Sequence, residues 1–164
     1  MVEPCEIAEH PYVYIPWGLS PGTLQTEIDT VGDLETLETE GVELREAIEA
    51  GDVDLADSDW ELTTPIGGVQ KFSRLREGIE RFFVTDINNP AGSAIAQSTL
   101  PVMWDEISGD DASHFNHVPG GCNVLYMDGH VEFLKYSGLH GAKFPVNEGG
   151  LIFHELTHDE HAHP

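Results

Sequence analysis

The chain has 164 residues, a length typical of one domain with its own hydrophobic core. Its 7 Lys and Arg against 30 Asp and Glu give a formal net charge of −23 at pH 7, which repels phosphates and anionic lipids. Nucleic acid and the membrane surface are therefore excluded as partners of this segment. No run of residues approaches the ~18 apolar residues of a membrane span, and residues 1–10 lack the features of a secretory signal.

The N-terminal part of the chain contains one predicted strand and one predicted helix. The string YVYIPWGL, residues 12–19, predicts a short strand because it combines aromatic and aliphatic residues. Residues 25–65 are acidic and short of aromatic residues, which predicts a partly irregular, solvated insertion. The clearest helix inside it is residues 41–52, with Gly51 as its stop and an apolar face made of Leu44, Ala47 and Ile48.

A second predicted helix covers residues 69–87. Its apolar residues recur at i, i+4, i+7 and i+8, so we expect one apolar stripe covering the core, made of Leu75, Ile79, Phe82 and Phe83. The same segment holds four of the seven basic residues, Lys71, Arg74, Arg76 and Arg81. Two interpretations remain open: these cations form ion pairs within the acidic domain, or they form a patch that docks an acidic neighbour.

The strongest structural signal is a strand pair near the C-terminus. Residues 98–107 predict one strand, and residues 123–127 and 130–136 predict a hairpin around Asp128-Gly129, a dipeptide favoured in two-residue type I′ turns. That turn would pair Tyr126 with Val131 and Val124 with Phe133, and place these four side chains on one face under the helix of residues 69–87. We expect an α+β domain over residues 1–148 and a mobile, His-rich acidic tail over residues 149–164.

The string FNHVPGGCNVLYMDGHVEF, residues 115–133, resembles the C-terminal signature of the prepilin-type, processing-associated proteins with an H-X9-DG pattern. The resemblance covers roughly residues 70–146 and identifies His117 as the motif His and Asp128 and Gly129 as the motif pair. Ten residues separate His117 from Asp128 here, where the family pattern has nine. Such proteins are similar to the type II secretion pseudopilins, which carry a cleaved leader and a hydrophobic N-terminal helix. This sequence lacks both, so we expect it to be a truncated fragment.

The resemblance implies a fold and a function. It implies a pilin-like α/β head that lies outside the cytoplasm and is anchored to the membrane in the full-length protein. It implies a structural or assembly role without catalysis, with sister pseudopilin subunits or secretion-machinery proteins as partners. No required cofactor is expected.

Two metal-binding alternatives follow from the residues. Calcium prefers oxygen ligands, and four carboxylates could converge with loop carbonyls around one ion: Asp105, Asp110, Asp111 and Asp128. Similar pseudopilin heads use a calcium-bound loop near this place. Alternatively, the motif residues serve only the loop and turn geometry, with His117 bonded to loop backbone.

The tail contains a complete HExxH sequence, in which His154 and His158 would bind zinc on one helix face and Glu155 would act as general base. A catalytic zinc needs a third protein ligand in a shaped cleft, and only six residues follow His158. We therefore expect no peptidase, although His154, His158 and His161 could chelate zinc loosely. Cys5 and Cys122 either form a disulfide or stay unpaired.

Overall fold

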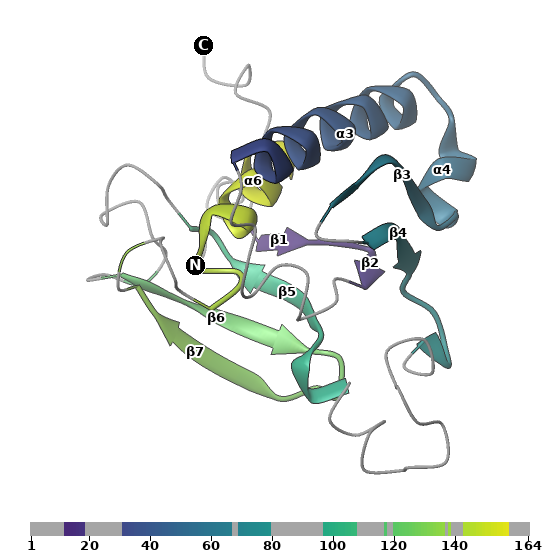
Figure 1. Ribbon diagram of the computed structural model, residues 1–164. Helices are drawn as coiled ribbons and strands as arrows, with labels where there is room; N and C mark the ends of the chain where they lie inside the picture. The colour runs from purple at the N-terminus through teal and green to yellow at the C-terminus, as the bar shows by residue number, and fades with distance from the viewer. Residues whose placement is uncertain are drawn as a thin grey trace, which may run out of the picture.

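The structure is a computed structural model that describes residues 12–18, 31–66, 69–79, 97–107, 117, 120–136, 138 and 143–157. It is a mixed α+β fold with a four-stranded antiparallel sheet of order β1-β5-β6-β7 and a three-stranded antiparallel sheet of order β2-β4-β3 (Figure 1). The elements are β1 (Tyr12–Tyr14), β2 (Trp17–Gly18), α3 (Val31–Glu49), α4 (Val53–Asp57), β3 (Trp60–Ile66), β4 (Val69–Arg74), β5 (Pro101–Asp105), β6 (Gly121–Tyr126), β7 (Val131–Lys135) and α6 (Glu148–Thr157).

The four-stranded sheet buries one of its faces. Val13, Trp104 and Val124 occupy one row across β1, β5 and β6, and each is at most 1% exposed. The ring of Phe144 meets Trp104 edge-on at 5.1 Å between centroids, and Phe153 of α6 packs against Phe144 at 6.2 Å. Because side chains alternate between the two faces of a strand, this row fixes which residues of the sheet point away from the core.

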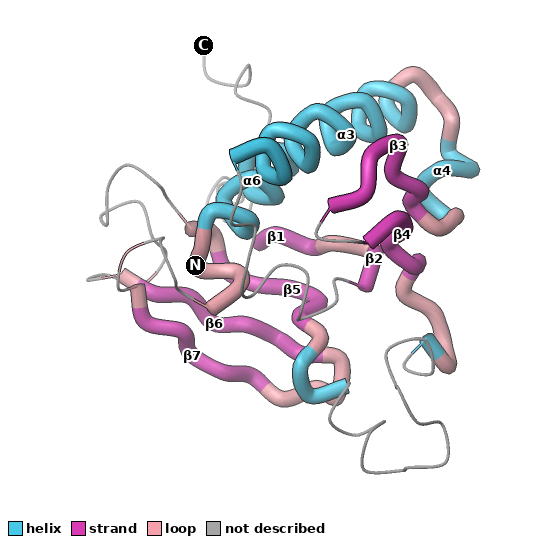
Figure 2. The backbone as a smooth tube through the Cα atoms, in the orientation of Figure 1, coloured by secondary structure: helices cyan, strands magenta, loops and turns pink. Residues whose placement is uncertain are grey.

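The three-stranded sheet packs its aromatic residues against the helices. Trp60 lies 5.7 Å from Trp17 and 5.2 Å from Phe72 between ring centroids, in tilted arrangements. Leu37 of α3 is fully buried in the same core. Figure 2 shows α3 and α6 side by side, with α6 next to β1. None of the helices in the described part of the chain is long and apolar enough to cross a bilayer.

Helix α3 has a defined stop and a close crossing with α6. Gly51 adopts φ +107° and its N–H donates to Ile48 O at 3.0 Å, so the predicted stop is confirmed. Gly41 lies under the tip of Leu156, where a Cβ would overlap that side chain. The absence of a side chain at Gly41 therefore lets the two helices approach closely.

The interpretation of residues 25–65 as a partly irregular insertion is wrong for its described portion. This segment forms α3, α4 and β3, and its apolar residues belong to the core. The physical reason is an apolar stripe that begins before residue 41 and recurs every three or four positions along α3: Leu34, Leu37, Gly41, Leu44 and Ile48. Burying this stripe requires the whole helix, so the segment is part of the domain.

The predicted helix over residues 69–87 is also wrong in its described portion, because residues 69–74 form strand β4. Ile66 pairs with Val69, so only Gly67-Gly68 lies between β3 and β4, and this dipeptide favours a tight hairpin. Gly78 adopts φ +80°, which interrupts a helix at that point. Of the expected stripe, Ile79 is fully buried, and Phe82 and Phe83 lie outside the described residues.

The predicted mobile tail is corrected over its first residues. Residues 148–157 form α6, which packs against α3 and β1, so the domain extends beyond residue 148. Ile152 is 9% exposed and Phe153 is 3% exposed, which explains why this segment is ordered against the core. Residues 158–164 lie outside the described residues.

The hairpin of β6 and β7 has a different register from the predicted one. Leu125 pairs with Val131 and Asn123 pairs with Phe133, one residue away from the expected pairing. The Tyr126 N–H donates to His130 O at 3.0 Å, so three residues form the loop instead of two. Gly129 has φ +89° and its N–H donates to Tyr126 O, the geometry of a type I turn followed by a glycine bulge.

Candidate functional site

The motif residue His117 lies against the outer face of the four-stranded sheet. Its Nε2 lies 2.9 Å from Asp105 Oδ2 and 2.7 Å from Asn123 Nδ2. In the tautomer with a proton on Nε2, this nitrogen donates to the carboxylate of Asp105; in the other tautomer, it accepts from the amide of Asn123. The ring of Phe133 meets the imidazole edge-on at 6.0 Å between centroids.

Asp105 is the centre of this cluster. Its side chain is 8% exposed, and Oδ2 accepts hydrogen bonds from the backbone N–H of Asn123 at 2.8 Å and from Asn123 Nδ2 at 2.9 Å. Because Asp105 is on β5 and Asn123 is on β6, the carboxylate joins two strands through side-chain bonds as well as through the ladder. We call Asp105, His117 and Asn123 the strand-bridging cluster. The sequence singled out Asp105 and His117, and the amide of Asn123 was not predicted.

Asp128 and Gly129 lie at the opposite end of the sheet, in the hairpin loop. Asp128 Oδ1 accepts from the backbone N–H of His130 at 3.0 Å and lies 2.5 Å from His130 Nδ1. These hydrogen bonds, led by the backbone one, lower the pKa of Asp128. The imidazole of His130 stacks on the Tyr126 ring at 4.5 Å with an interplanar angle of 4°. The motif aspartate therefore caps the turn and orients its neighbour.

A second polar cluster lies beside the hairpin. The Tyr126 hydroxyl donates to Glu132 Oε2 at 3.1 Å, and Lys143 Nζ donates to the same oxygen. The hydrogen bond from Lys143 is the main cause that lowers the pKa of Glu132, whereas burial raises the pKa of Tyr126. No sequence signal marked this cluster, because Lys143 is eleven residues from Glu132.

The expected calcium ligands do not converge in the described part of the chain. Pro101 of β5 pairs with Tyr126, next to the loop that holds Asp128, whereas Asp105 is at the other end of β5. Four residues of strand separate the two carboxylates by roughly 13 Å, which is too far for one ion. Asp110 and Asp111 lie outside the described residues. No group of three His, Cys, Asp or Glu among the described residues could hold a metal ion.

The basic residues of the described segment pair within the molecule. Lys71 Nζ lies 3.0 Å from Asp59 Oδ2, and Arg76 Nη2 lies 2.7 Å from Asp59 Oδ1. The backbone N–H of Arg74 also donates to Asp59 Oδ1, and this bond is the main cause that lowers the pKa of Asp59. Arg74 Nη1 further donates to Pro16 O at 2.8 Å.

Lys71, Arg74 and Arg76 therefore form ion pairs within the domain, which was one interpretation of the sequence, and docking of an acidic neighbour by this segment stays a prediction. The fourth basic residue of the segment, Arg81, lies outside the described residues.

The first four residues of the HExxH sequence, 154–157, lie on α6. His154 has a side chain that is 16% exposed, with Nε2 3.5 Å from Glu106 Oε1, while Glu155 is exposed. His158 and His161 lie outside the described residues. Cys122 is a free, fully buried thiol whose pKa is raised to about 12, chiefly by burial, so it is unreactive in the folded state. Cys5 lies outside the described residues.

The outer face of the four-stranded sheet carries large apolar side chains. The register places Tyr14, Met103, Leu125 and Val131 in one row and Tyr12, Asn123 and Phe133 on the same face. Four of them are at least half exposed: Tyr12 at 58%, Tyr14 at 51%, Val131 at 60% and Phe133 at 53%. We call these four residues the outer sheet patch. The strand-bridging cluster lies between its two halves, with Asp105 on β5 and Asn123 on β6.

Comparison with family models, with curated proteins and with solved structures finds no match to this chain.

Proposed function

We propose that this chain is the globular head of a pseudopilin-like subunit, a non-enzymatic component that lies outside the cytoplasm and packs in a secretion or filament system. The resemblance of residues 115–133 to the H-X9-DG proteins supports the family in this proposal. The geometry of the motif residues supports a structural role for them. His117 and Asp128 each bond to neighbouring groups of the sheet, at opposite ends of the β5–β6 pair.

The outer sheet patch is the observation that carries this proposal. Exposed aromatic and β-branched side chains on both edge strands, β1 and β7, form a surface typical of protein–protein contacts. The strand-bridging cluster joins β5 and β6, the two strands between the halves of the patch, and a sheet held in place before docking loses less entropy on docking. Sister subunits or secretion-machinery proteins are the partners that we propose for this surface.

The proposal is tested by site-specific photocrosslinking in the native host. Benzoylphenylalanine replaces Phe133 or Tyr14 in the patch, and a control places it at Val53 of α4, which is 66% exposed and lies outside the patch. We expect Phe133 and Tyr14 to crosslink a copy of this chain or a protein with a pilin-type hydrophobic N-terminal helix, as identified by mass spectrometry. Equal crosslinking from Val53, or none from the two patch positions, would contradict the proposal.

A further inference from the structure

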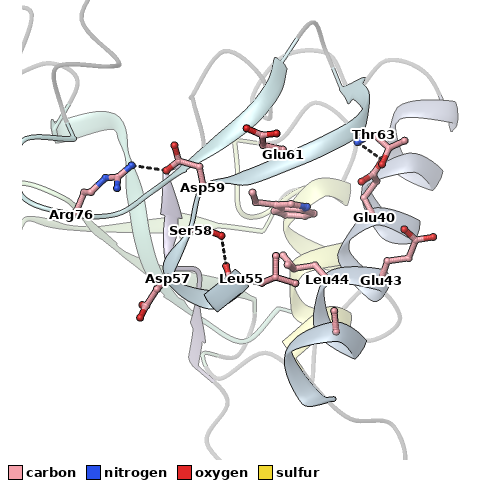
Figure 3. A pocket seen from close by; sticks show the side chains of 12 residues that line it. Glu40, Glu43, Leu44, Leu55, Asp57, Ser58, Asp59, Glu61, Thr63 and Arg76 are labelled. Atoms are coloured by element: carbon pink, nitrogen blue, oxygen red, sulfur yellow. Dashed lines mark hydrogen bonds and ion pairs between the residues drawn. The ribbon is translucent and has the colours of Figure 1, made fainter. Parts of the chain in front are cut away.

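Helices α3 and α4 and strand β3 enclose a pocket on another part of the surface (Figure 3). Its volume is about 770 Å³, within the range of small-molecule sites. Its apolar lining comes from Leu44, Ala47, Leu55 and Trp60. Its acidic lining comes from Glu40, Glu43, Asp57, Asp59 and Glu61. The pocket therefore combines an indole and aliphatic surface with five carboxylates.

Only part of this acidic lining is neutralised by cations of the chain. Asp59 pairs with Lys71 and Arg76, and Asp57 Oδ1 lies 3.6 Å from Arg74 Nη2. These pairs lie at the end of the pocket near β4, where Figure 3 shows Arg76 reaching Asp59. The carboxylates contributed by α3 and by the exposed side of β3 are not paired with cations in this way.

Glu40 is the buried member of the uncompensated group. The residue is 9% exposed, and its Oε1 accepts hydrogen bonds from the N–H groups of Thr63 at 2.8 Å and Thr64 at 3.1 Å. Among the described residues, its second oxygen, Oε2, has no hydrogen-bond or ion-pair partner. Glu43 and Glu61 are exposed and likewise have no cation partner within that part of the chain. Three carboxylates thus line one side of the pocket without an ion-pair partner among the described residues.

The spacing of these groups selects the kind of ligand. A metal ion needs three or more ligands around one point, and no such group occurs in the described residues. Carboxylates spread around an apolar surface instead suit a cation that is itself extended and partly apolar. The indole of Trp60, which also lines the pocket, adds apolar surface for the alkyl part of such a cation.

We propose that this pocket binds an extended organic cation, an alkyl chain that ends in an ammonium group. The alkyl chain lies along Leu44 and Trp60, and the charge meets Glu40, Glu43 and Glu61. The same chemistry is found in a lysine side chain of a partner protein and in a free polyamine. The inference does not depend on the pseudopilin assignment, because it uses only the pocket and its charges.

The test is isothermal titration calorimetry at 150 mM NaCl with two probes, spermidine and an acetylated, amidated Gly-Lys-Gly peptide. We expect millimolar or tighter binding of at least one probe to the wild-type chain. The double variant Glu43→Gln/Glu61→Gln should bind about tenfold more weakly, since each lost ion pair contributes a modest amount. A Trp60 fluorescence change on binding would place the probe in the pocket.

The matched control is Glu38→Gln/Glu46→Gln, which removes the same charge from exposed positions of α3 outside the pocket. We expect its affinity to stay within twofold of wild type. Equal weakening in both double variants would show attraction by net charge alone and would overturn the proposal, as would the absence of binding by either probe. Binding of spermidine alone would indicate a free amine, and binding of the peptide alone would indicate a partner's side chain.

Discussion

Removing the carboxylate of Asp105 should destabilise the fold more than any other change in the strand-bridging cluster. In Asp105→Ala, the backbone N–H of Asn123 loses its acceptor between two strands, and a buried unsatisfied donor costs about 1–3 kcal/mol. The side chains of Asn123 and His117 lose a charged acceptor but regain water, because His117 is 48% exposed. We expect a total loss of roughly 2–4 kcal/mol in the free energy of unfolding.

The contribution of the motif His is separable by a double-mutant cycle. His117→Ala alone should cost about 1 kcal/mol, and it should cost almost nothing in the Asp105→Ala background, since its main partner is already gone. Urea unfolding followed by tryptophan fluorescence measures all four free energies. His130→Ala is the control, because His130 bonds to Asp128 and should add independently to Asp105→Ala. If the His117 and Asp105 changes are additive within about 0.3 kcal/mol, the structural role of the motif His is refuted.

Two further predictions concern charge and packing. The pKa of Asp59 is lowered from its ordinary value of 3.8, so the ionised side chain stabilises the fold at pH values above 3.8. This contribution is lost as the pH falls through the pKa of the folded state. The unfolding free energy of Asp59→Asn, measured from pH 7 to pH 3, should therefore be below wild type at neutral pH and converge with it in acid; a constant difference would contradict this. Gly150→Ala would place a Cβ 2.6 Å from Pro145 C, a backbone overlap costing about 1–3 kcal/mol that exceeds the ~1 kcal/mol gain in helix propensity. Gly41→Ala meets only the flexible tip of Leu156, so its melting temperature should fall less, and an unchanged midpoint for Gly150→Ala would show that α6 does not pack there.

The sequence predicted those features that depend on one strong local signal. The stop of α3 at Gly51 and the strand that became β5 both follow from residues that are close in sequence. The first half of α3 was missed because its carboxylates mask the apolar stripe through Leu34 and Leu37. A helix with a narrow stripe and many exposed charges resembles a solvated segment until its partner helix is known.

The errors at β4 and α6 have a different origin. Residues 69–79 satisfy a helical spacing, but Phe72 reaches Trp60 only if the segment is extended and paired with β3. Tertiary pairing therefore overrides the local period. In α6, the apolar run is short and is followed by a charged, His-rich end, so the sequence was interpreted as a mobile tail. The burial of Phe153 depends on its contact with Phe144, and no spacing rule predicts that these two residues meet.

Of the candidate site, the sequence identified His117, Asp105 and the hairpin loop but not their partners. Hydrogen bonds between side chains on neighbouring strands depend on register, and the register could not be derived from the turn dipeptide alone. The basic segment shows the same limitation. Its cations were visible, but Asp59 as their common partner depends on how β3 pairs with β4.

The one-residue difference in the hairpin decides which face of the sheet is available to a partner. A two-residue loop would have placed Val131 and Phe133 on the same face as Val124 and Tyr126, inside the core. The three-residue loop turns Val131 and Phe133 outward instead, where they are 60% and 53% exposed. The extra loop residue follows from the hydrogen bond of Gly129 N–H to Tyr126 O. The motif glycine thus sets the register that exposes the β7 half of the outer sheet patch.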